Sequence, residues 1–302
     1  MPPLIECVPN ISEGRDRRVI DDIVGAAQRA EGCRVLHVSP DEDHNRTVIT
    51  MVGSPASVGE AAVALAARAA SRIDLTRHSG EHPRMGAVDV VPFVPLREAS
   101  YAECAALSRR VGARIWREAR VPVFLYALSA TGDHRKNLAD IRRGGFEGMF
   151  DKIKQPQWRP DFGGAIHPTA GAVACGARRP LVAFNVNLDT DDISAAREIA
   201  KALRQSDGGL PGVLALGMLM RSRNRPMAQV SMNLCDTEKT PLWRAFEAVR
   251  GEALARGICV AGSEIVGMIS RRALDSCAGH DLRLTGFDAR AQVLEDHIID
   301  LS

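Results

Sequence analysis

The chain reads T-R-H-S-G-E-H-P-R-M-G-A-V-D at residues 76–89, between an apolar helix pattern at residues 56–73 and an apolar strand pattern at residues 87–95. We call residues 76–89 the central loop. A polar segment with glycines and a proline between two apolar elements is typical of a loop that carries functional side chains. The central loop therefore marks where a helix ends and a strand begins, and the other elements can be placed outward from it.

Outward from the central loop, the two parts of the chain show the same order of patterns: strand, helix, strand, strand, helix, strand. In the first part, strands are expected at residues 4–8, 33–38, 47–52 and 88–94, and helices at residues 17–30 and 56–73. In the second part, strands are expected at residues 181–188, 213–220, 227–234 and 260–269, and helices at residues 193–204 and 242–256. This is the order of the split β-α-β unit of the ferredoxin-like fold. We therefore predict an α+β protein with two ferredoxin-like (βαββαβ) subdomains, residues 1–178 and 179–302, and a ligand cleft or tunnel between them.

The segment between the two parts is less regular. A helix is expected at residues 101–120, a strand at residues 121–126 and a short helix at residues 136–141. From residue 144 to residue 176 the pattern dissolves into glycine, proline and isolated aromatic residues. A connection of this length inside a compact protein is usually functional, so we predict that it joins the halves and contacts a ligand. A plain interdomain linker is the alternative interpretation.

The bulk composition excludes several classes of protein. The 302 residues are 45% hydrophobic and 25% charged, with a net charge of +2, which does not favour nucleic acid or a membrane surface as partner. Only 4% of residues are aromatic and no R-G-F-G-F-type run occurs, which argues against a ferredoxin-like RNA-binding module. The seven cysteines show no C-x-x-C spacing, and no signal peptide or long apolar stretch is present. We therefore expect a cytoplasmic protein.

The central loop admits three interpretations. His78, Glu81 and His82 match the H-x-x-E-H zinc motif, in which a helix must place both histidines on one metal. Gly80 and Pro83 oppose a continuous helix, so we expect no metal. The second interpretation is a loop that presents one histidine as general acid and base, since its ordinary pKa of about 6.5 permits both roles. The third is that the histidines only satisfy a surface loop.

Six motifs then resemble those of one enzyme family. They are E-C-V-P-N-I-S-E-G at residues 6–14, N-R-T-V at 45–48, G-E-H-P-R-M-G-A at 80–87, P-D-F-G at 160–163, A-F-N-V-N-L at 183–188 and A-Q-V-S at 228–231. Through these motifs the chain resembles the formiminotransferase family, whose enzymes move the formimino group of N-formimino-L-glutamate to N5 of tetrahydrofolate. The resemblance runs over nearly the whole chain in order.

The resemblance implies two α/β subdomains with folate, as tetrahydrofolate, in a tunnel between them, and a catalytic histidine that is here His82. It also implies folate contacts in the glycine-rich segment, which here is Gly163, Gly164, Ala165, Ile166, His167, Pro168, Thr169, Ala170 and Gly171. Arg178, Arg179, Asn185 and Asn187 are further candidates, the arginines for the folate glutamyl tail and the asparagines for the pterin. The chain lacks the cyclodeaminase domain of the animal enzyme, so we expect a separate cyclodeaminase to process the product.

Two departures from the animal pattern concern the donor. The folate segment is one residue shorter and places His167 where an apolar residue is expected, and residues 39–44 are more charged. The sequence therefore leaves open a related donor such as N-formylglutamate or another small amide or amidine. A zinc hydrolase built on His78, Glu81 and His82 is the remaining alternative.

The mechanism we expect centres on one imidazole. His82 would carry a proton from the folate amine to the departing glutamate nitrogen. The substrate-binding candidates are Asn10, Glu13, Asp41, Arg46 and Arg84. The two arginines would bind the carboxylates of the donor. The carboxylate of Asp41 or Glu13 would hold the amidinium group of the donor or orient the histidine. Exposed apolar sheet edges favour a homodimer.

Overall fold

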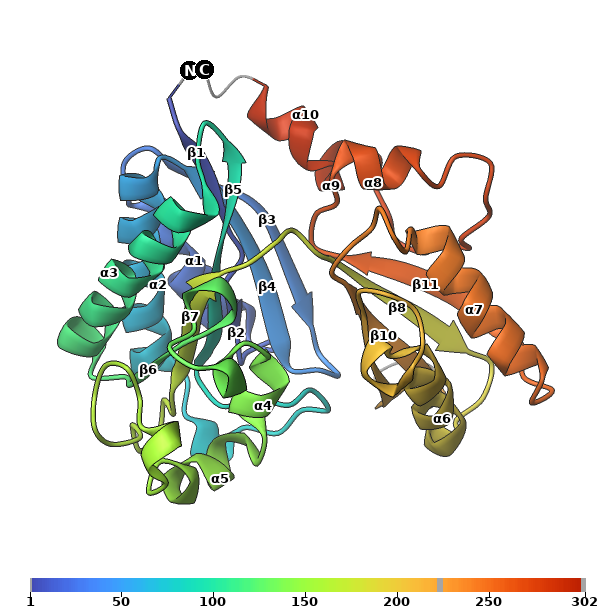
Figure 1. Cartoon of the computed structure of the whole chain (residues 1–302), viewed down its shortest axis with the longest axis horizontal. Helices are drawn as coiled ribbons and strands as arrows, with labels where there is room; N and C mark the ends of the chain where they lie inside the picture. The colour runs from blue at the N-terminus through green and yellow to red at the C-terminus, as the bar shows by residue number, and fades with distance from the viewer. Residues whose placement is uncertain (1, 222–224, 300–302) are drawn as a thin grey trace. The chain divides into compact units, whose positions relative to one another are not determined.

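The computed structural model describes residues 2–221 and 225–299, which form two compact units with their boundary in the chain between Arg178 and Arg179 (Figure 1). Each unit contains one β-sheet with its own hydrophobic core. Both units contain helices and strands, and the prediction of an α+β protein is confirmed. Within the described residues, no helix combines the length and the apolar character needed to cross a membrane.

The sheet of the first unit is antiparallel along most of its width. β1 (Leu4–Cys7) and β2 (Asn10–Ile11) lie between β4 (Arg46–Gly53) and β5 (Val88–Arg97), and β3 (Cys33–Asp41) pairs with β4. Pro9, which lacks an N–H, separates β1 from β2, but its carbonyl still accepts a hydrogen bond from Ile49 N. The four strands predicted for residues 1–95 are therefore neighbours, and the short strand β2, which follows Pro9, was not predicted.

Three helices cover one face of this sheet: α1 (Arg17–Gln28), α2 (Pro55–Arg72) and α3 (Tyr101–Ala119) (Figure 1). Their starts follow from local sequence. The side chains of Asp16, Ser54 and Ser100 accept hydrogen bonds from the first turns of α1, α2 and α3, which satisfies N–H groups that the helix itself leaves unpaired. Local signals of this kind explain why these helices were predicted within two residues of their observed ends.

Residues 120–177 differ from the prediction. After β6 (Val123–Leu125) and α4 (Leu138–Arg142), the structure has a further helix, α5 (Gly145–Lys152), and a further strand, β7 (Val173–Ala177). β7 pairs in parallel with both β5 and β6, so it extends the sheet of the first unit. The prediction that residues 144–176 form an irregular connection between the halves was wrong. β7 reads V-A-C-G-A and is buried along its whole length, so it lacks the apolar–polar alternation that identifies a half-buried strand.

Short 3-10 turns complete the first unit and the start of the second. They are η1 (Leu75–Arg77), η2 (Ala127–Ser129), η3 (Asp133–Arg135), η4 (Pro156–Trp158) and η5 (Gln205–Asp207). Turns of this kind commonly connect longer elements, and η1 leads from α2 into the central loop.

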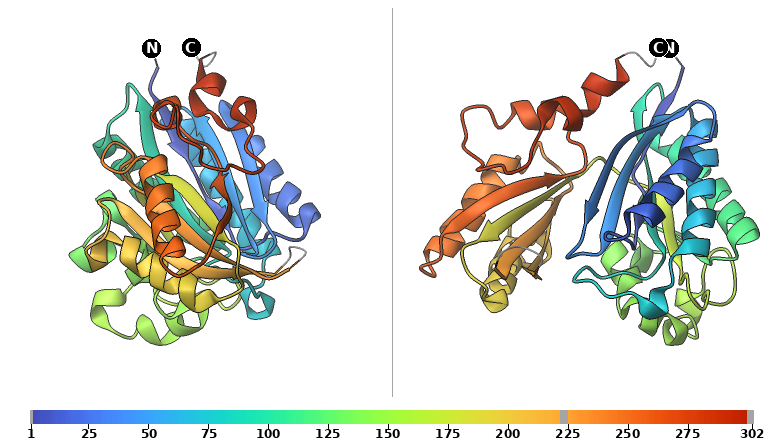
Figure 2. Two further views of the ribbon diagram at one scale, coloured as in Figure 1. Left: turned by 90° about the vertical axis from the view of Figure 1, so that its right-hand side faces the viewer. Right: turned by 180° about the vertical axis from the view of Figure 1, so that it is seen from behind.

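The second unit has a four-stranded antiparallel sheet in the order β11-β8-β10-β9. The strands are β8 (Val182–Leu188), β9 (Val213–Met220), β10 (Met227–Leu234) and β11 (Val260–Val266). α6 (Ile193–Leu203) and α7 (Leu242–Leu254) lie against one face of this sheet, as the views of Figure 2 also show. The chain then continues into α8 (Arg271–Asp275), α9 (Ala289–Gln292) and α10 (Leu294–Ile298).

Candidate active site

Three loops of the first unit meet around Asn45. Asn45 has a left-handed backbone (φ 47°), and its side-chain oxygen accepts a hydrogen bond from Gly14 N at 2.9 Å. Its side-chain amide donates to the carbonyl of Ser79 at 2.9 Å. Ser12 Oγ donates to the carbonyl of Gly86 at 2.8 Å. The loop after β2, the β3–β4 loop and the central loop are therefore joined by side-chain to backbone hydrogen bonds.

Two glycines permit this close approach. A Cβ on Gly14 would overlap the backbone carbonyl of Asp41, and a Cβ on Gly80 would overlap the carbonyl of His44. Any larger residue would push the loops apart. Gly80, which argued against a zinc-binding helix in the central loop, thus allows that loop to pack against the β3–β4 loop.

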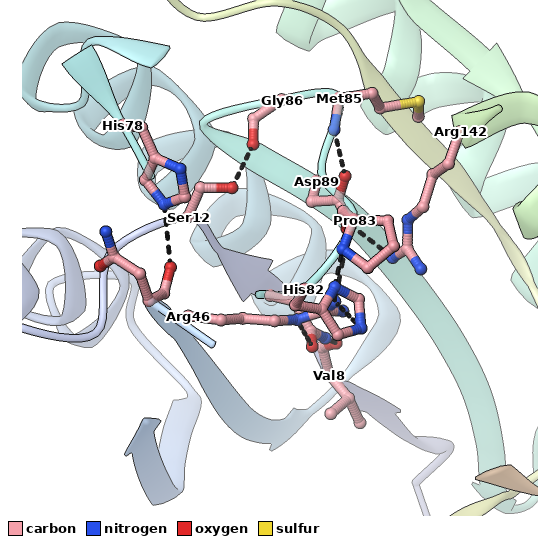
Figure 3. A network of polar contacts seen from close by, with 12 residues as sticks. Val8, Ser12, Arg46, His78, His82, Pro83, Met85, Gly86, Asp89 and Arg142 are labelled. Carbon is pink, nitrogen blue, oxygen red and sulfur yellow. Dashed lines mark hydrogen bonds and ion pairs between the residues drawn. The ribbon is translucent and has the colours of Figure 1, made fainter. Parts of the chain in front are cut away.

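His82 lies on a non-helical part of the central loop, as predicted, since η1 ends at Arg77 and no helix follows before β5. Its ring is partly buried. Nδ1 lies 2.7 Å from the carbonyl of Pro83, and Arg46 Nη1 lies 2.5 Å from Nδ1 and 2.7 Å from Nε2 (Figure 3). The imidazole therefore sits directly against a guanidinium group.

Arg46 is held in place by Asn10. Arg46 Nε donates to Asn10 Oδ1 at 2.8 Å, and Asn10 Nδ2 donates to the carbonyl of Val8 at 2.9 Å. Burial lowers the pKa of Arg46 to about 9, with a further lowering by Arg142 that the negative charge of Asp89 opposes. Arg46 nevertheless remains charged at neutral pH, so the structure places a cation beside His82.

Two residues that the sequence analysis missed complete this charge cluster. The carboxylate of Asp89, at the start of β5, is 1% exposed and accepts a hydrogen bond from Met85 N at 2.8 Å. Its other oxygen contacts the guanidinium of Arg142, at the end of α4, and lies 3.9 Å from Arg46 Nη1 (Figure 3). One signal was available for Asp89, because a carboxylate inside an apolar strand pattern requires a partner. Arg142 is one of many arginines and had no distinguishing signal.

Burial and this charge cluster both lower the pKa of His82. Removal of the ring from solvent lowers the pKa of His82 well below its ordinary value, and the positive charges of Arg46, Arg142 and His44 lower it further. The hydrogen bond with the Pro83 carbonyl acts in the opposite direction. His82 is therefore neutral at neutral pH and able to accept a proton.

Arg84 has different partners from Arg46. Its two Nη atoms donate to the carboxylate of Glu147 at 3.0 and 2.8 Å, and its Nε donates to His78 Nδ1 at 3.1 Å. His78 Nε2 lies 3.0 Å from the carbonyl of Asn45. Both ring nitrogens of His78 and the fork of Arg84 are thus already engaged, so Arg84 does not stand beside Arg46 as a second open clamp.

The two candidate carboxylates also have partners of their own. Asp41 Oδ2 lies 2.7 Å from His44 Nδ1, and Oδ1 accepts from His44 N at 2.8 Å. Burial would raise the pKa of Asp41, but its bonds with His44 outweigh burial and lower it. Glu13 accepts hydrogen bonds from Arg15 N and Asp16 N ahead of α1. Asp41 therefore orients His44, and Glu13 shapes the turn before α1.

The end of the predicted folate segment lies against the central loop. The carbonyl of Ala170 accepts from Ala87 N at 2.9 Å, and that of Thr169 accepts from Leu75 N at 2.8 Å. His167 and Gly171 close a tight turn through two backbone hydrogen bonds of 3.0 Å. The imidazole of His167 stabilises this turn, because its Nδ1 accepts from Ala170 N at 2.9 Å.

The other predicted folate residues lie elsewhere. Gly163 packs against Trp116 and Pro122 with φ at 98°, and its neighbours Gly164 and Ala165 are exposed. Arg178 follows β7 at the end opposite Gly171, where its N–H donates to the Phe93 carbonyl. The remaining candidates belong to the second unit, where Asn187 accepts a hydrogen bond from Gln229 at 2.9 Å and Asn185 donates to Glu264 at 3.2 Å. Within residues 2–221 and 225–299, no group of three or more His, Cys, Asp or Glu side chains is arranged to hold a metal ion.

The fold and the site together describe a two-unit α+β protein whose neutral histidine, beside two arginines, is suited to acid–base chemistry on an anionic substrate. Two family descriptions match the chain: "Formiminotransferase domain, N-terminal subdomain" at residues 4–178 and "Formiminotransferase domain" at residues 183–301. The chain belongs to the formiminotransferase family.

Curated relatives agree with this assignment. A glutamate formimidoyltransferase of Streptococcus pyogenes serotype M1 is 47% identical over 300 residues, which is 99% of this chain and 100% of the relative. One of Thermoplasma acidophilum is 44% identical over 94% of each chain. The formimidoyltransferase-cyclodeaminase of Mus musculus is 43% identical over 91% of this chain and 51% of its own length.

Proposed function

We propose that this chain transfers the formimino group of N-formimino-L-glutamate to N5 of tetrahydrofolate, giving 5-formiminotetrahydrofolate and glutamate. The reaction belongs to histidine degradation and one-carbon metabolism. The observation that carries the proposal is His82 of the G-E-H-P-R-M-G motif, neutral and set against Arg46, in a chain whose relatives over full length are named glutamate formimidoyltransferase.

The reaction exchanges one amine for another at a single carbon. N5 of tetrahydrofolate attacks the formimino carbon, which becomes tetrahedral and carries both amines. N5 then loses a proton, the glutamate nitrogen gains one, and the bond between that nitrogen and the carbon breaks. A neutral imidazole at this point accepts the first proton and delivers the second, so His82 returns to its starting state.

The other predicted residues support this step in different ways. Arg46 binds the anionic donor, because its guanidinium lies against His82 and is fixed by Asn10. Asp41 pairs with His44 and orients its ring, and this ring packs beside the ring of His82. Arg84 supports the central loop through its contacts with His78, and a donor carboxylate that engaged Arg84 would have to displace Glu147. Glu13 holds the turn that carries Gly14 to the β3–β4 loop.

Tetrahydrofolate acts as co-substrate and binds along the segment from Gly163 to Gly171. The contacts of residues 169–172 with the end of the central loop support this placement. We propose that each unit is a ferredoxin-like subdomain. Support comes from the strand order of the second sheet, β11-β8-β10-β9. If the four strands of this unit are numbered along the chain, that order is four, one, three, two. Arg178 and Asn187 are proposed as further folate contacts.

The proposal extends to partners and location. A homodimer is supported by β9, an edge strand whose Leu214 and Leu216 are each 44% exposed. A separate cyclodeaminase processes the product, by analogy with relatives whose names join the two activities. A cytoplasmic location is supported by the seven free cysteines.

The test is incubation of the purified protein with N-formimino-L-glutamate and tetrahydrofolate, followed by the absorbance of a new folate species. The expected result is a species that requires protein and both substrates. N-formylglutamate is offered in parallel as the alternative donor. If only N-formylglutamate supports transfer, it replaces N-formimino-L-glutamate as the proposed donor. Transfer from neither compound would contradict the proposed function.

A further inference from the structure

The charges around His82 do not balance. Arg46 and Arg142 bring two guanidinium groups into a partly buried region, with side chains that are 15% and 14% exposed. Asp89 is the carboxylate that contacts them both, and His82 is neutral. A cation withdrawn from water without a counter-ion is costly, so this cluster favours an anion from a ligand.

Arg142 also retains hydrogen-bonding capacity. Its Nη2 forms an ion pair with Asp89, and both Nη2 and Nε are covered by the protein without a geometrically formed hydrogen bond to a described residue. Asp89 in turn is fixed by Met85 N. Asp89 thus holds the guanidinium at Nη2, and a ligand carboxylate would meet the part of the side chain that is still exposed, close to Arg46.

We propose that Arg142, together with Arg46, binds the α-carboxylate of the amino-acid donor and that the enzyme selects its donor by this group. The inference rests on the proposed function. The α-carboxylate is attached to the same carbon as the nitrogen that carries the formimino group. When that nitrogen meets His82, its α-carboxylate would lie beside Arg46, which contacts the His82 ring, and near Arg142, which pairs with Asp89 next to Arg46 (Figure 3). The side-chain carboxylate of glutamate is two carbons further away from this position.

Three donors separate the two carboxylates. N-formimino-L-glutamate has both, N-formimino-4-aminobutyrate lacks the α-carboxylate, and N-formimino-L-alanine lacks the side-chain carboxylate. For the unaltered enzyme we expect kcat/KM to be about 10- to 100-fold lower with the aminobutyrate donor than with N-formimino-L-glutamate, because a charge-assisted hydrogen-bonded pair is lost. With the alanine donor we expect a smaller decrease.

Arg142→Ala is the matching variant. It should raise KM for N-formimino-L-glutamate by about 10-fold or more, leave KM for tetrahydrofolate unchanged and have little further effect on the aminobutyrate donor, which has no α-carboxylate to lose. Arg142→Lys keeps a charge opposite Asp89 but not the fork, so we expect an intermediate loss. Arg143→Ala is the control, because Arg143 is the next residue, its side chain is 79% exposed and its partner is Asp140.

The outcomes distinguish the inference from the proposed function. No transfer from any donor by the unaltered enzyme would contradict the proposed function. Transfer in which Arg142→Ala and Arg143→Ala have the same KM for N-formimino-L-glutamate, or in which the unaltered enzyme shows no preference between the glutamate and aminobutyrate donors, would overturn the role of Arg142. Arg142→Ala removes the ion pair between Arg142 and Asp89, so thermal unfolding of each variant is measured beside the kinetics. If Arg142→Ala does not fold, the comparison rests on Arg142→Lys, and an unchanged donor preference there would overturn the role.

Discussion

The rings of His44 and His82 meet edge to face, with centroids 6.0 Å apart and planes inclined by 63°. His44 comes from the β3–β4 loop and His82 from the central loop, so the contact joins two segments that are separate in sequence. Asp41 fixes the orientation of His44 through a 2.7 Å ion pair. The imidazole of His82, which we propose as the proton carrier, thus packs against the imidazole of His44, which is held in turn by the carboxylate of Asp41.

Replacement of His44 tests this contact. His44→Gln removes the ring that supports His82, and we expect kcat/KM to fall by about 10-fold or more because the position of His82 is less well defined. The pKa of His82 should also rise, since the charged form of His44 lowers it. His280→Gln, in the second unit, is the control. An unchanged kcat/KM and an unchanged His82 pKa in His44→Gln would show that the contact has no role.

The pKa of His82 can be measured directly by NMR titration of its ring proton, assigned from the signal absent in His82→Gln. Burial comes first among the causes that lower this pKa, followed by the charges of Arg46 and Arg142. Because these favour the neutral form, we expect the midpoint to lie below the ordinary value of about 6.5. In Arg46→Met the midpoint should move upward towards that value. A midpoint at or above 6.5 in the unaltered protein would contradict the assigned environment.

The contact between the central loop and the glycine-rich segment predicts a difference between two glycines. A Cβ on Gly86 would overlap the carbonyl of Ala172, whereas no atom lies within 4 Å of a Cβ on Gly164. Gly86→Ala should therefore lower the free energy of unfolding by about 1–3 kcal/mol, as for overpacking. Gly164→Ala should change it by about 1 kcal/mol at most. Urea unfolding of both variants decides the matter, and equal stabilities would count against the observed packing.

Metal removal separates the proposed transferase from the zinc hydrolase. Both ring nitrogens of His78 already have hydrogen-bonding partners, namely Asn45 and Arg84. We therefore expect dialysis against a chelator to leave the transfer rate unchanged. Metal analysis of the untreated protein accompanies the assay. Stoichiometric zinc, with activity lost on chelation and regained with zinc, would favour the hydrolase.

The sequence predicts the elements whose signals are local. α2 was expected at residues 56–73 and is observed at Pro55–Arg72, because Ser54 caps it and its apolar residues recur at helical spacing. α5 and β7 were missed. β7 is short and buried on both faces, so its identity comes from the strands beside it rather than from a pattern of its own.

The same distinction holds for the site. His82 stands out because the central loop concentrates charged and polar residues between two apolar elements. The pairing of Asp89 with Arg142 joins the start of β5 to the end of α4, and single-sequence spacing does not report a contact between such distant segments. Arg84 was expected to face the substrate because it neighbours His82, but backbone direction in a non-helical loop turns it towards Glu147.

The central claim is that His82 carries the proton between the two amines, and single-turnover transfer by His82→Ala tests it most directly. Formation of the new folate species is followed after N-formimino-L-glutamate is mixed with enzyme and tetrahydrofolate, while tetrahydrofolate binding is measured separately. We expect the transfer rate to fall by about 100-fold or more and the affinity for tetrahydrofolate to stay the same. Transfer at the rate of the unaltered enzyme would contradict the claim.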